Sequence, residues 1–336
     1  MVATDRNGFV ESLHFGAAAV ARPDGRLIAA VGDAAYETFV RSSAKPFQVL
    51  ALLLAPRADE LALTEREIAL ACASHGGLPE HVEVARGLLA RAGLGEGHLA
   101  CGAHPPMDAD HARALVVAGT EPTPLHNNCS GKHAAMLLAC HLRGWPTMGY
   151  TEGGHRIQEE VRRWVGTCCR VGAETVGEGL DGCSVPTFHL SLLAVARGYA
   201  ALVEPAAAGL APRVARAVER VFAAMGREPM MVAGPGRFTT RLMEVTAGRI
   251  VGKEGAEGFY AMAVQGPRRL GMAFKIADGG DRARDVMALE LLQRFDCLTA
   301  EELTALDDFR RPVLRNHRLL PVGTIAPLPF PVTAID

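Results

Sequence analysis

Apolar residues gather into short runs near both ends of the chain, and these runs predict β-strands. Segments 15–21 and 26–31 are rich in small and β-branched residues and flank Pro23-Asp24-Gly25. Asp-Gly between two such runs is typical of a β-hairpin turn. Three further strand-like runs, separated by Gly and Pro, cover residues 249–252, 258–264 and 270–277. We therefore expect both ends of the chain to contribute strands to a sheet.

Helical periodicity dominates between these two groups of strands. Segment 43–54 is apolar almost all round, which predicts a buried helix with Pro46 in its first turn. Thr64 and Glu67 form a capping box that predicts a helix running to about residue 72. The other predicted helices cover residues 79–91, 129–142, 155–165, 190–203, 212–225 and 283–295.

This order of elements predicts an α+β fold. An antiparallel sheet built from about 8–40 and 230–280 would carry a helical lobe of about 60–225, with a cleft where the two meet. Repeats, low-complexity tracts and long linkers are not visible in the sequence. We therefore expect residues 1–336 to form one two-lobed unit.

Composition and charge exclude several classes of protein. The chain has 336 residues, of which 49% are hydrophobic and 21% charged, as in a packed globular protein. Its net charge of -2 argues against a nucleic-acid partner and a polybasic membrane anchor. Neither a signal peptide nor an apolar stretch of about 20 residues is visible. Eight cysteines without an export signal indicate reduced thiols, so we expect a cytoplasmic protein.

Lysine is rare in this chain. Only four of its 35 basic residues are lysines, namely Lys45, Lys132, Lys253 and Lys275. A lysine amine can lose its proton, whereas a guanidinium effectively cannot. The pattern indicates either a compositional bias toward arginine or lysines kept where arginine cannot do the chemistry.

Ser42 and Lys45 are the first candidates for such chemistry. They lie three residues apart at a predicted helix start and therefore share one helix face. An unprotonated lysine amine at that position can take the serine proton and make the hydroxyl a nucleophile. The structural alternative is a serine N-cap followed by a lysine in the first turn.

Ser74 and His75 follow the capping-box helix in the segment Cys72-Ala73-Ser74-His75-Gly76-Gly77. The segment is faintly similar to a nucleophile elbow, but Cys72 replaces the first glycine and no strand precedes it. Taken alone, it is best interpreted as a helix C-terminus with His75 at the negative end of the dipole.

Cys129 opens a predicted helix and shares a face with Lys132. A thiol at a helix N-terminus beside Lys132 and His133 suits nucleophilic attack or metal binding. Cys183 could complete a site if the fold brings it close, although the spacing alone is only weakly typical of zinc. The structural alternative is that both cysteines are small buried residues.

Gly252-Lys253-Glu254-Gly255 follows a predicted strand and is similar to the K-T-G element of S-x-x-K hydrolases. Glu254 replaces the threonine, and the sequence contains no S-D-N element, which disfavours a β-lactam substrate. Gly234-Pro235-Gly236 lacks the third glycine of a dinucleotide fingerprint, so nucleotide chemistry is not indicated.

Together these motifs resemble the bacterial L-asparaginase II family of the Rhizobium etli type. The resemblance extends from residue 8 to about residue 321. Its matching segments are residues 8–14, 41–46, 72–75, 101–106, 127–133, 181–183, 252–258 and 275–279.

The resemblance implies a penicillin-recognising serine hydrolase fold (glutaminase/β-lactamase-like), a homodimer, and hydrolysis of L-asparagine to L-aspartate and ammonia. It implies two catalytic Ser–Lys pairs, Ser42 with Lys45 and Ser74 with Lys253. It also implies a zinc ion on Cys129, Lys132 and Cys183. Asp181, His75 and Asn128 are expected to support these ligands or to contact the substrate. Lys275 falls in a matching segment but receives no role.

Three alternative functions remain open at this point. The first is an S-x-x-K hydrolase acting on another amide or on a β-lactam. The second is a thiol hydrolase using Cys129 and His133. The third is a non-catalytic binding protein stabilised by zinc. The preference for asparagine over glutamine is also open, because one methylene is worth only about 1–3 kcal/mol.

Overall fold

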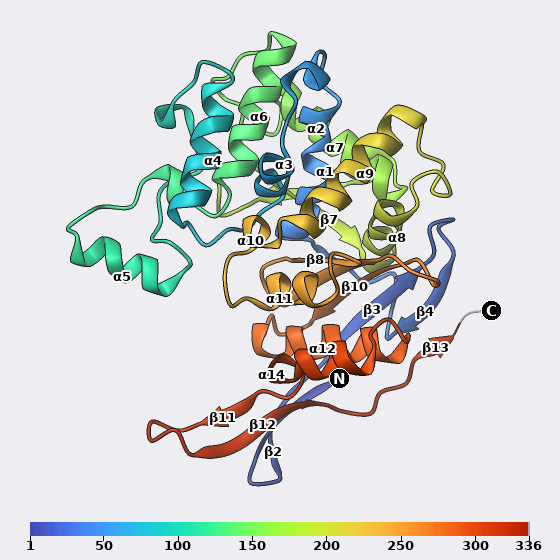
Figure 1. Ribbon diagram of the computed structural model, residues 1–336. Helices are drawn as coiled ribbons and strands as arrows, with labels where there is room; N and C mark the ends of the chain where they lie inside the picture. Colours follow the sequence, from blue (N-terminus) through green and yellow to red (C-terminus); the bar gives the residue numbers. More distant parts are fainter. Residues whose placement is uncertain (335–336) are drawn as a thin grey trace.

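Six antiparallel strands form the central sheet of the protein, whose computed structural model describes residues 1–334 (Figure 1). In spatial order they are β13 (Thr333–Ala334), β4 (Leu27–Val31), β3 (Gly16–Ala21), β10 (Leu270–Ile276), β9 (Phe259–Val264) and β8 (Ile250–Glu254). Early strands thus pair with late ones, since β3 is hydrogen-bonded to β10 along its whole length. The α+β prediction and its five predicted strands are confirmed.

The sheet is buried on both faces, and side-chain alternation along each strand divides the core in two. In β3, Ala17, Ala19 and Ala21 face the helical lobe, whereas Ala18 and Val20 face the opposite layer. α8 (Leu192–Val203) packs on the first face and α12 (Asp281–Arg294) on the second. Figure 1 shows α12 below the sheet and the other long helices above it.

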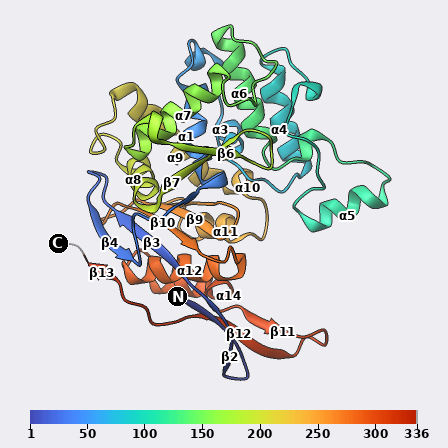
Figure 2. The same ribbon diagram turned by 180° about the vertical axis from the view of Figure 1, so that it is seen from behind.

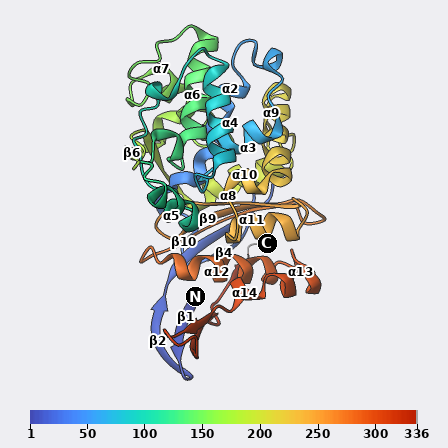
Figure 3. The ribbon, with the colours of Figure 1, turned by 60° about the vertical axis from the view of Figure 1, so that its left-hand side comes forward.

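The helical lobe covers the upper face of the sheet (Figure 2). Its helices are α1 (Lys45–Gln48), α2 (Leu50–Leu53), α3 (Glu65–Ala71), α4 (Pro79–Ala90), α5 (Ala109–Val117), α6 (Ser130–Arg143), α7 (Arg156–Cys169), α8, α9 (Pro212–Arg227) and α10 (Pro229–Val232). α5 buries none of its own side chains and projects away from the lobe in Figure 1, so it comes forward in the turned view of Figure 3. Within residues 1–334, no helix combines the length and the apolar character needed to cross a membrane.

Two smaller sheets flank the central one. Below it lie β11 (Val313–Arg315), β12 (Pro321–Pro327), β1 (Val2–Arg6) and β2 (Phe9–His14). Beside the helical lobe lie β5 (Glu37–Phe39), β7 (Pro186–Ser191) and β6 (Gly177–Leu180). The lower layer also holds α11 (Phe238–Val245), α13 (Ala300–Ala305) and α14 (Asp307–Arg310).

Two predicted helices differ from the structure. The predicted helix 43–54 is a 3₁₀ turn, η1 (Arg41–Ala44), followed by the short helices α1 and α2. Because this segment is buried all round, its apolar pattern carried no information about where the helix breaks. The predicted helix 190–203 begins only at Leu192, because Leu190 belongs to β7 and Ser191 caps the helix by accepting a hydrogen bond from the Ala194 N–H.

Candidate active site

The turn that carries Ser42 and Lys45 is fixed to the central sheet. The backbone N–H of Lys45 donates to the Ser42 carbonyl, so the two side chains leave one side of a single helical turn. Ser43 Oγ donates to the Lys253 carbonyl on β8 at 2.8 Å, and the Tyr199 hydroxyl of α8 donates to the Ser43 carbonyl at 2.9 Å. Both lobes therefore hold this turn in place.

Ser74 lies between the amines of two lysines that are far apart in the sequence. Its Oγ is 3.1 Å from Lys45 Nζ and 2.8 Å from Lys253 Nζ. All three side chains are buried, and Lys45 also donates to the Ala73 carbonyl. In contrast, Ser42 Oγ is partly exposed and makes no hydrogen bond within residues 1–334. The structure thus joins the side chains of Lys45, Ser74 and Lys253, and Ser42 is tied to Lys45 only through its backbone carbonyl.

Lys253 occupies an environment that disfavours its charged form. Burial lowers the pKa of its amine to about 7, and the neighbouring charges of Lys45 and Arg237 act in the same direction. Glu254 opposes this effect, with its Oε1 3.3 Å from Lys253 Nζ. An amine with a pKa near 7 can both accept and release a proton at neutral pH.

Glu254 is a buried carboxylate that the sequence did not single out as a site residue. Burial alone would raise its pKa, but the positive charges of Lys253, Arg237 and Arg284 outweigh burial and hold it well below the usual range. Its two oxygens accept hydrogen bonds from Arg237 Nη2 at 3.1 Å and from Thr239 Oγ1 at 2.5 Å. The available signal was its position next to Lys253, where a K-T-G element has a neutral threonine.

A second cluster joins the thiols of Cys129 and Cys183 to Lys132. Lys132 Nζ donates to Cys183 Sγ at 3.0 Å, and all three residues are buried. A hydrogen bond from the Cys183 thiol lowers the pKa of Cys129 well below its ordinary value. The same contact, together with burial, raises the pKa of Cys183. Although burial opposes it, the charge on Cys183 raises the pKa of Lys132.

This cluster fits the zinc ion that the sequence resemblance implies, provided that Lys132 is a ligand. Within residues 1–334, no group of three His, Cys, Asp or Glu side chains is placed to hold a metal. Two thiols and one amine are nevertheless gathered at a single point, and sulfur and nitrogen are the donors that zinc prefers. The carboxylate of Asp181 lies next to the thiol cluster, with its Oδ2 3.7 Å from Cys183 Sγ.

Arg41 links the thiol cluster to the Ser42 turn. Its Nε donates to Asp181 Oδ1 at 2.8 Å, and Asp181 in turn contacts Cys183. The backbone of Arg41 has φ +49°, a left-handed conformation that costs a non-glycine residue about 1–2 kcal/mol. Strained backbone of this kind is concentrated at functional sites, where the surroundings hold it.

His75, Asn128 and His133 are the remaining residues that the sequence singled out, and each has its own hydrogen-bond partner. His75 is buried, with Nε2 2.9 Å from Ser130 Oγ, and burial lowers its pKa well below its ordinary value. Asn128 Oδ1 lies 2.9 Å from Cys129 Sγ, at the edge of the thiol cluster. His133 bonds through Nδ1 to the Tyr150 hydroxyl at 2.7 Å, and its buried Nε2 has no hydrogen-bond partner within residues 1–334, so His133 makes no hydrogen bond to the Cys129 thiol.

Lys275, for which the sequence suggested no role, has a structural contact. Its amine donates to the Glu257 carbonyl in the turn between β8 and β9. That turn follows directly after Lys253 and Glu254, so Lys275 helps to hold the end of the strand that carries them.

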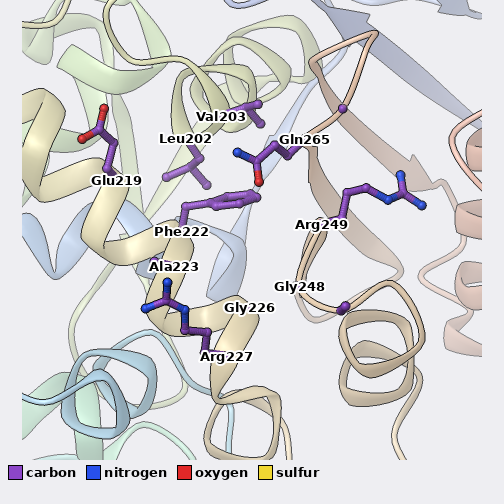
Figure 4. Close-up of a pocket in the computed structure, with 12 residues that line it drawn as sticks. Leu202, Val203, Glu219, Phe222, Ala223, Gly226, Arg227, Gly248, Arg249 and Gln265 are labelled. Atoms are coloured by element: carbon purple, nitrogen blue, oxygen red, sulfur yellow. The ribbon is translucent and has the colours of Figure 1, made fainter.

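A separate cavity of about 550 Å³ opens between α9, the end of α8 and the turns that flank β8 and β9 (Figure 4). Phe222 and Gln265 point toward each other inside it. The guanidinium of Arg249 turns away and bonds to the Cys297 carbonyl and to Glu302. The lining contains no serine, cysteine, histidine or lysine, so this cavity holds none of the candidate nucleophiles or bases.

Solved structures of the protein Mglu show a distant similarity to this chain. Mglu in its L-glutamate binding form is 17% identical, with a TM-score of 0.39, 84% of this chain covered and 60% of that chain covered. Its native form is 16% identical, with a TM-score of 0.37 and coverages of 84% and 61%. The chain therefore spans about three fifths of the length of these structures.

Family membership is decided at the level of sequence. No curated protein matches the chain. The sequence model of the L-asparaginase II family, however, matches residues 2–327, a span that contains both Ser–Lys pairs and the thiol cluster. With its match running from the first strand of the lower sheet to the end of β12, the chain belongs to the L-asparaginase II family.

Proposed function

We propose that this protein hydrolyses L-asparagine to L-aspartate and ammonia, with Ser42 as the nucleophile. Membership of the L-asparaginase II family supports the reaction and the substrate. The observation that carries the chemistry is the hydrogen-bonded chain Lys45–Ser74–Lys253, which begins one helical turn from Ser42. Such a chain can move a proton from a hydroxyl nucleophile to a leaving amine.

Acylation begins when Ser42 Oγ attacks the side-chain amide carbon of asparagine. The serine proton enters the hydrogen-bonded relay at Lys45, and the relay carries a proton through Ser74 to the amine of Lys253. Because the pKa of Lys253 is about 7, the relay can hold this proton at neutral pH and then deliver it to the amide nitrogen. The C–N bond breaks, ammonia leaves, and an aspartyl ester remains on Ser42.

Deacylation uses the same proton relay, with water as the nucleophile. Water attacks the ester carbon while the relay takes one of its protons, and that proton returns to Ser42 Oγ as the ester bond breaks. The products are L-aspartate and the original enzyme, so the relay ends each cycle with the proton count at which it began. General acid–base catalysis of this type is worth about 10²–10⁴ in rate.

Zinc is proposed to bind to Cys129, Lys132 and Cys183, with Asp181 behind them. Zinc bound there would supply a positive charge that can orient polar groups of the substrate. Arg41 ties this cluster to the serine turn, so the cluster also fixes the position of Ser42.

We also propose that residues 1–336 form one catalytic unit with a penicillin-recognising serine hydrolase fold, and that it works as a homodimer in the cytoplasm. Within residues 1–334 all eight cysteines are free and buried, which suits a reducing compartment. Phe9 and Val10 on β2 are 78% and 59% exposed, which suits contact with a second copy.

The decisive experiment measures ammonia release from L-asparagine and L-glutamine by the wild type and by Ser42→Ala. We expect release from asparagine in the wild type and its loss in Ser42→Ala. Ser12→Ala, a change of the same type on β2, should leave the rate unchanged. No release by zinc-loaded wild type would contradict the proposed function.

Trapping the ester identifies the nucleophile. Ser74→Ala should interrupt the relay and lower kcat by about 10²–10⁴. Intact-mass spectrometry after mixing with asparagine should then find the aspartyl group on Ser42. An ester found on Ser74 in the wild type would reverse the assignment. Release from a chromogenic β-lactam, with none from asparagine, would favour the alternative substrate class.

A further inference from the structure

Arg237 is a partly exposed cation at the Ser74 loop that has no part in the proton relay described above. It follows the turn Gly234-Pro235-Gly236 and immediately precedes α11. Its side chain is 28% exposed, and its Nη1 lies 3.4 Å from the Ser74 carbonyl. The guanidinium therefore reaches both the loop that holds the relay serine and the solvent.

Glu254 holds one part of this guanidinium and leaves another part available. Its Oε1 accepts from Nη2 at 3.1 Å. Nη1, by contrast, has only the long contact to the Ser74 carbonyl and one of 3.9 Å to Met107 Sδ. The negative charge of Glu254 is already compensated by Lys253 and Arg284 as well as by Arg237. An incoming anion would therefore meet the free hydrogens of Nη1.

Met107 and Asn128 complete a rim around this position. Asn128 Nδ2 lies 3.2 Å from Met107 Sδ, which is the sulfur that contacts Arg237. Met107 is 48% exposed, whereas Ser74, whose carbonyl is also contacted by Arg237, is only 5% exposed. We call Met107, Asn128 and Arg237 the rim. Its three residues come from segments that are distant in sequence, and it lies next to the loop that carries the buried Ser74.

The shape of asparagine sets the distance between its carboxylate and the amide that reacts. Its α-carboxylate carbon is three bonds from the amide carbon that Ser42 attacks, so the two carbons are at most about 4 Å apart. Arginine suits a carboxylate because its planar N–H groups can form two parallel, charge-assisted hydrogen bonds. Lys45 and Lys253 are fully buried and bonded to Ser74. Arg41 is as exposed as Arg237 and is bonded through Nε to Asp181, so it is the other arginine that the experiment below must test.

We propose that Arg237 binds the α-carboxylate of the substrate. It thereby restricts the enzyme to amides whose carboxylate carbon is three bonds from the amide carbon that reacts. This inference rests on the proposed function, because it assigns a specificity residue to the same site. Asn128 and Met107 form the wall against which the carboxylate end of the substrate would lie.

A comparison of two substrates tests this assignment. β-Alaninamide is asparagine with the carboxylate replaced by hydrogen, so it retains the amide and the amine. We expect Arg237→Gln to lower kcat/KM for asparagine by about a hundredfold more than kcat/KM for β-alaninamide, mainly through KM. Both substrates share the effect of the lost charge on Lys253, and only asparagine loses a partner for its carboxylate. Arg237→Lys, which keeps the charge that pairs with Glu254, should show a smaller loss of the same kind. Arg241→Gln, an exposed change on α11, should behave as the wild type.

The possible outcomes separate binding from structural support. If Arg237 only supports Glu254 and Lys253, kcat/KM should fall by the same factor for both substrates. That result, or an unchanged KM for asparagine in Arg237→Gln and Arg237→Lys, would overturn the assignment. If Arg41→Gln instead lost activity on asparagine alone, the substrate carboxylate would be assigned to Arg41, and the assignment to Arg237 would be wrong. Failure of the wild type to act on asparagine would count against the proposed function, a different result from any of these.

Discussion

Lys253 shows how neighbouring charges set the chemistry of a single side chain. Burial and the positive charges of Lys45 and Arg237 lower its pKa, while Glu254 raises it, and the balance is a pKa of about 7. A more exposed lysine would stay protonated at neutral pH and could not accept a proton. Glu254 therefore tunes the relay without touching the reacting atoms, which makes it a positioning residue.

The pH dependence of kcat/KM should report this balance. Below pH 7 Lys253 is already protonated and the relay cannot accept the serine proton, so activity should rise with pH through about 7. Glu254→Gln removes the group that raises the pKa, so the rising limb should move to lower pH. Glu244→Gln, an exposed change on α11, is the control. A limb that stays in place in Glu254→Gln would contradict this account.

The candidate site residues could be identified from the sequence, but their hydrogen-bond partners could not. The scarcity of lysine and the motif spacing pointed to Ser42, Lys45 and Lys253, whereas Ser74 was indicated only by the family resemblance. The bond from Lys45 to Ser74 depends on how the α3 loop packs against the Ser42 turn, which no local pattern records. The same holds for Arg237, whose partners are 17 and 163 residues away in sequence.

At the scale of elements, the contact between α8 and β10 positions the helical lobe on the sheet. A Cβ added at Gly271 would lie 1.9 Å from the Ala196 carbonyl oxygen and 2.2 Å from the Ala200 nitrogen. The helix backbone thus rests directly on the strand, and only glycine allows this approach. The alanines of β3 on the same face serve the same purpose.

Gly271→Ala should lower the free energy of unfolding by about 1–3 kcal/mol, because α8 must move away from the sheet. Gly87→Ala is a matched control in the interior of α4, where an added Cβ meets no atom within 4 Å. It should raise stability by about 0.5–1 kcal/mol. Urea denaturation measures both changes, and equal effects would contradict the close-packing argument.

The elements that the sequence predicted well are those with clear boundaries. The capping box of Thr64 and Glu67 and the central strands are of this type. The lower sheet was missed because the exposed Phe9, Val10 and Leu13 of β2 spoil the alternation that marks a half-buried strand. α5 was missed because a helix that buries no side chain has no apolar stripe.

At the scale of the whole molecule, zinc binding should be coupled to stability. A ligand that binds only the folded state stabilises it by about 2.7 kcal/mol at a hundredfold excess over Kd. We expect zinc to raise the melting temperature of the chelator-treated wild type and to bind once per chain. The double variant Cys129→Ser, Cys183→Ser should lose both effects.

Cys140→Ser is the matched control for this measurement. Cys140 is also a buried thiol on α6, but its neighbouring charge is Arg143 rather than Lys132. It should bind zinc as the wild type does. Loss of binding in Cys140→Ser, or none in the wild type, would contradict the proposed ligand set.

The pairing of β3 with β10 also affects how the protein emerges from the ribosome. About 250 residues separate the two strands, which at about 5–20 residues per second corresponds to roughly 12–50 s of synthesis. Throughout that time the apolar β3–β4 hairpin has no partner on its inner edge. The nascent chain should therefore depend on chaperone protection, and it can acquire its active site only after Lys253 has left the exit tunnel.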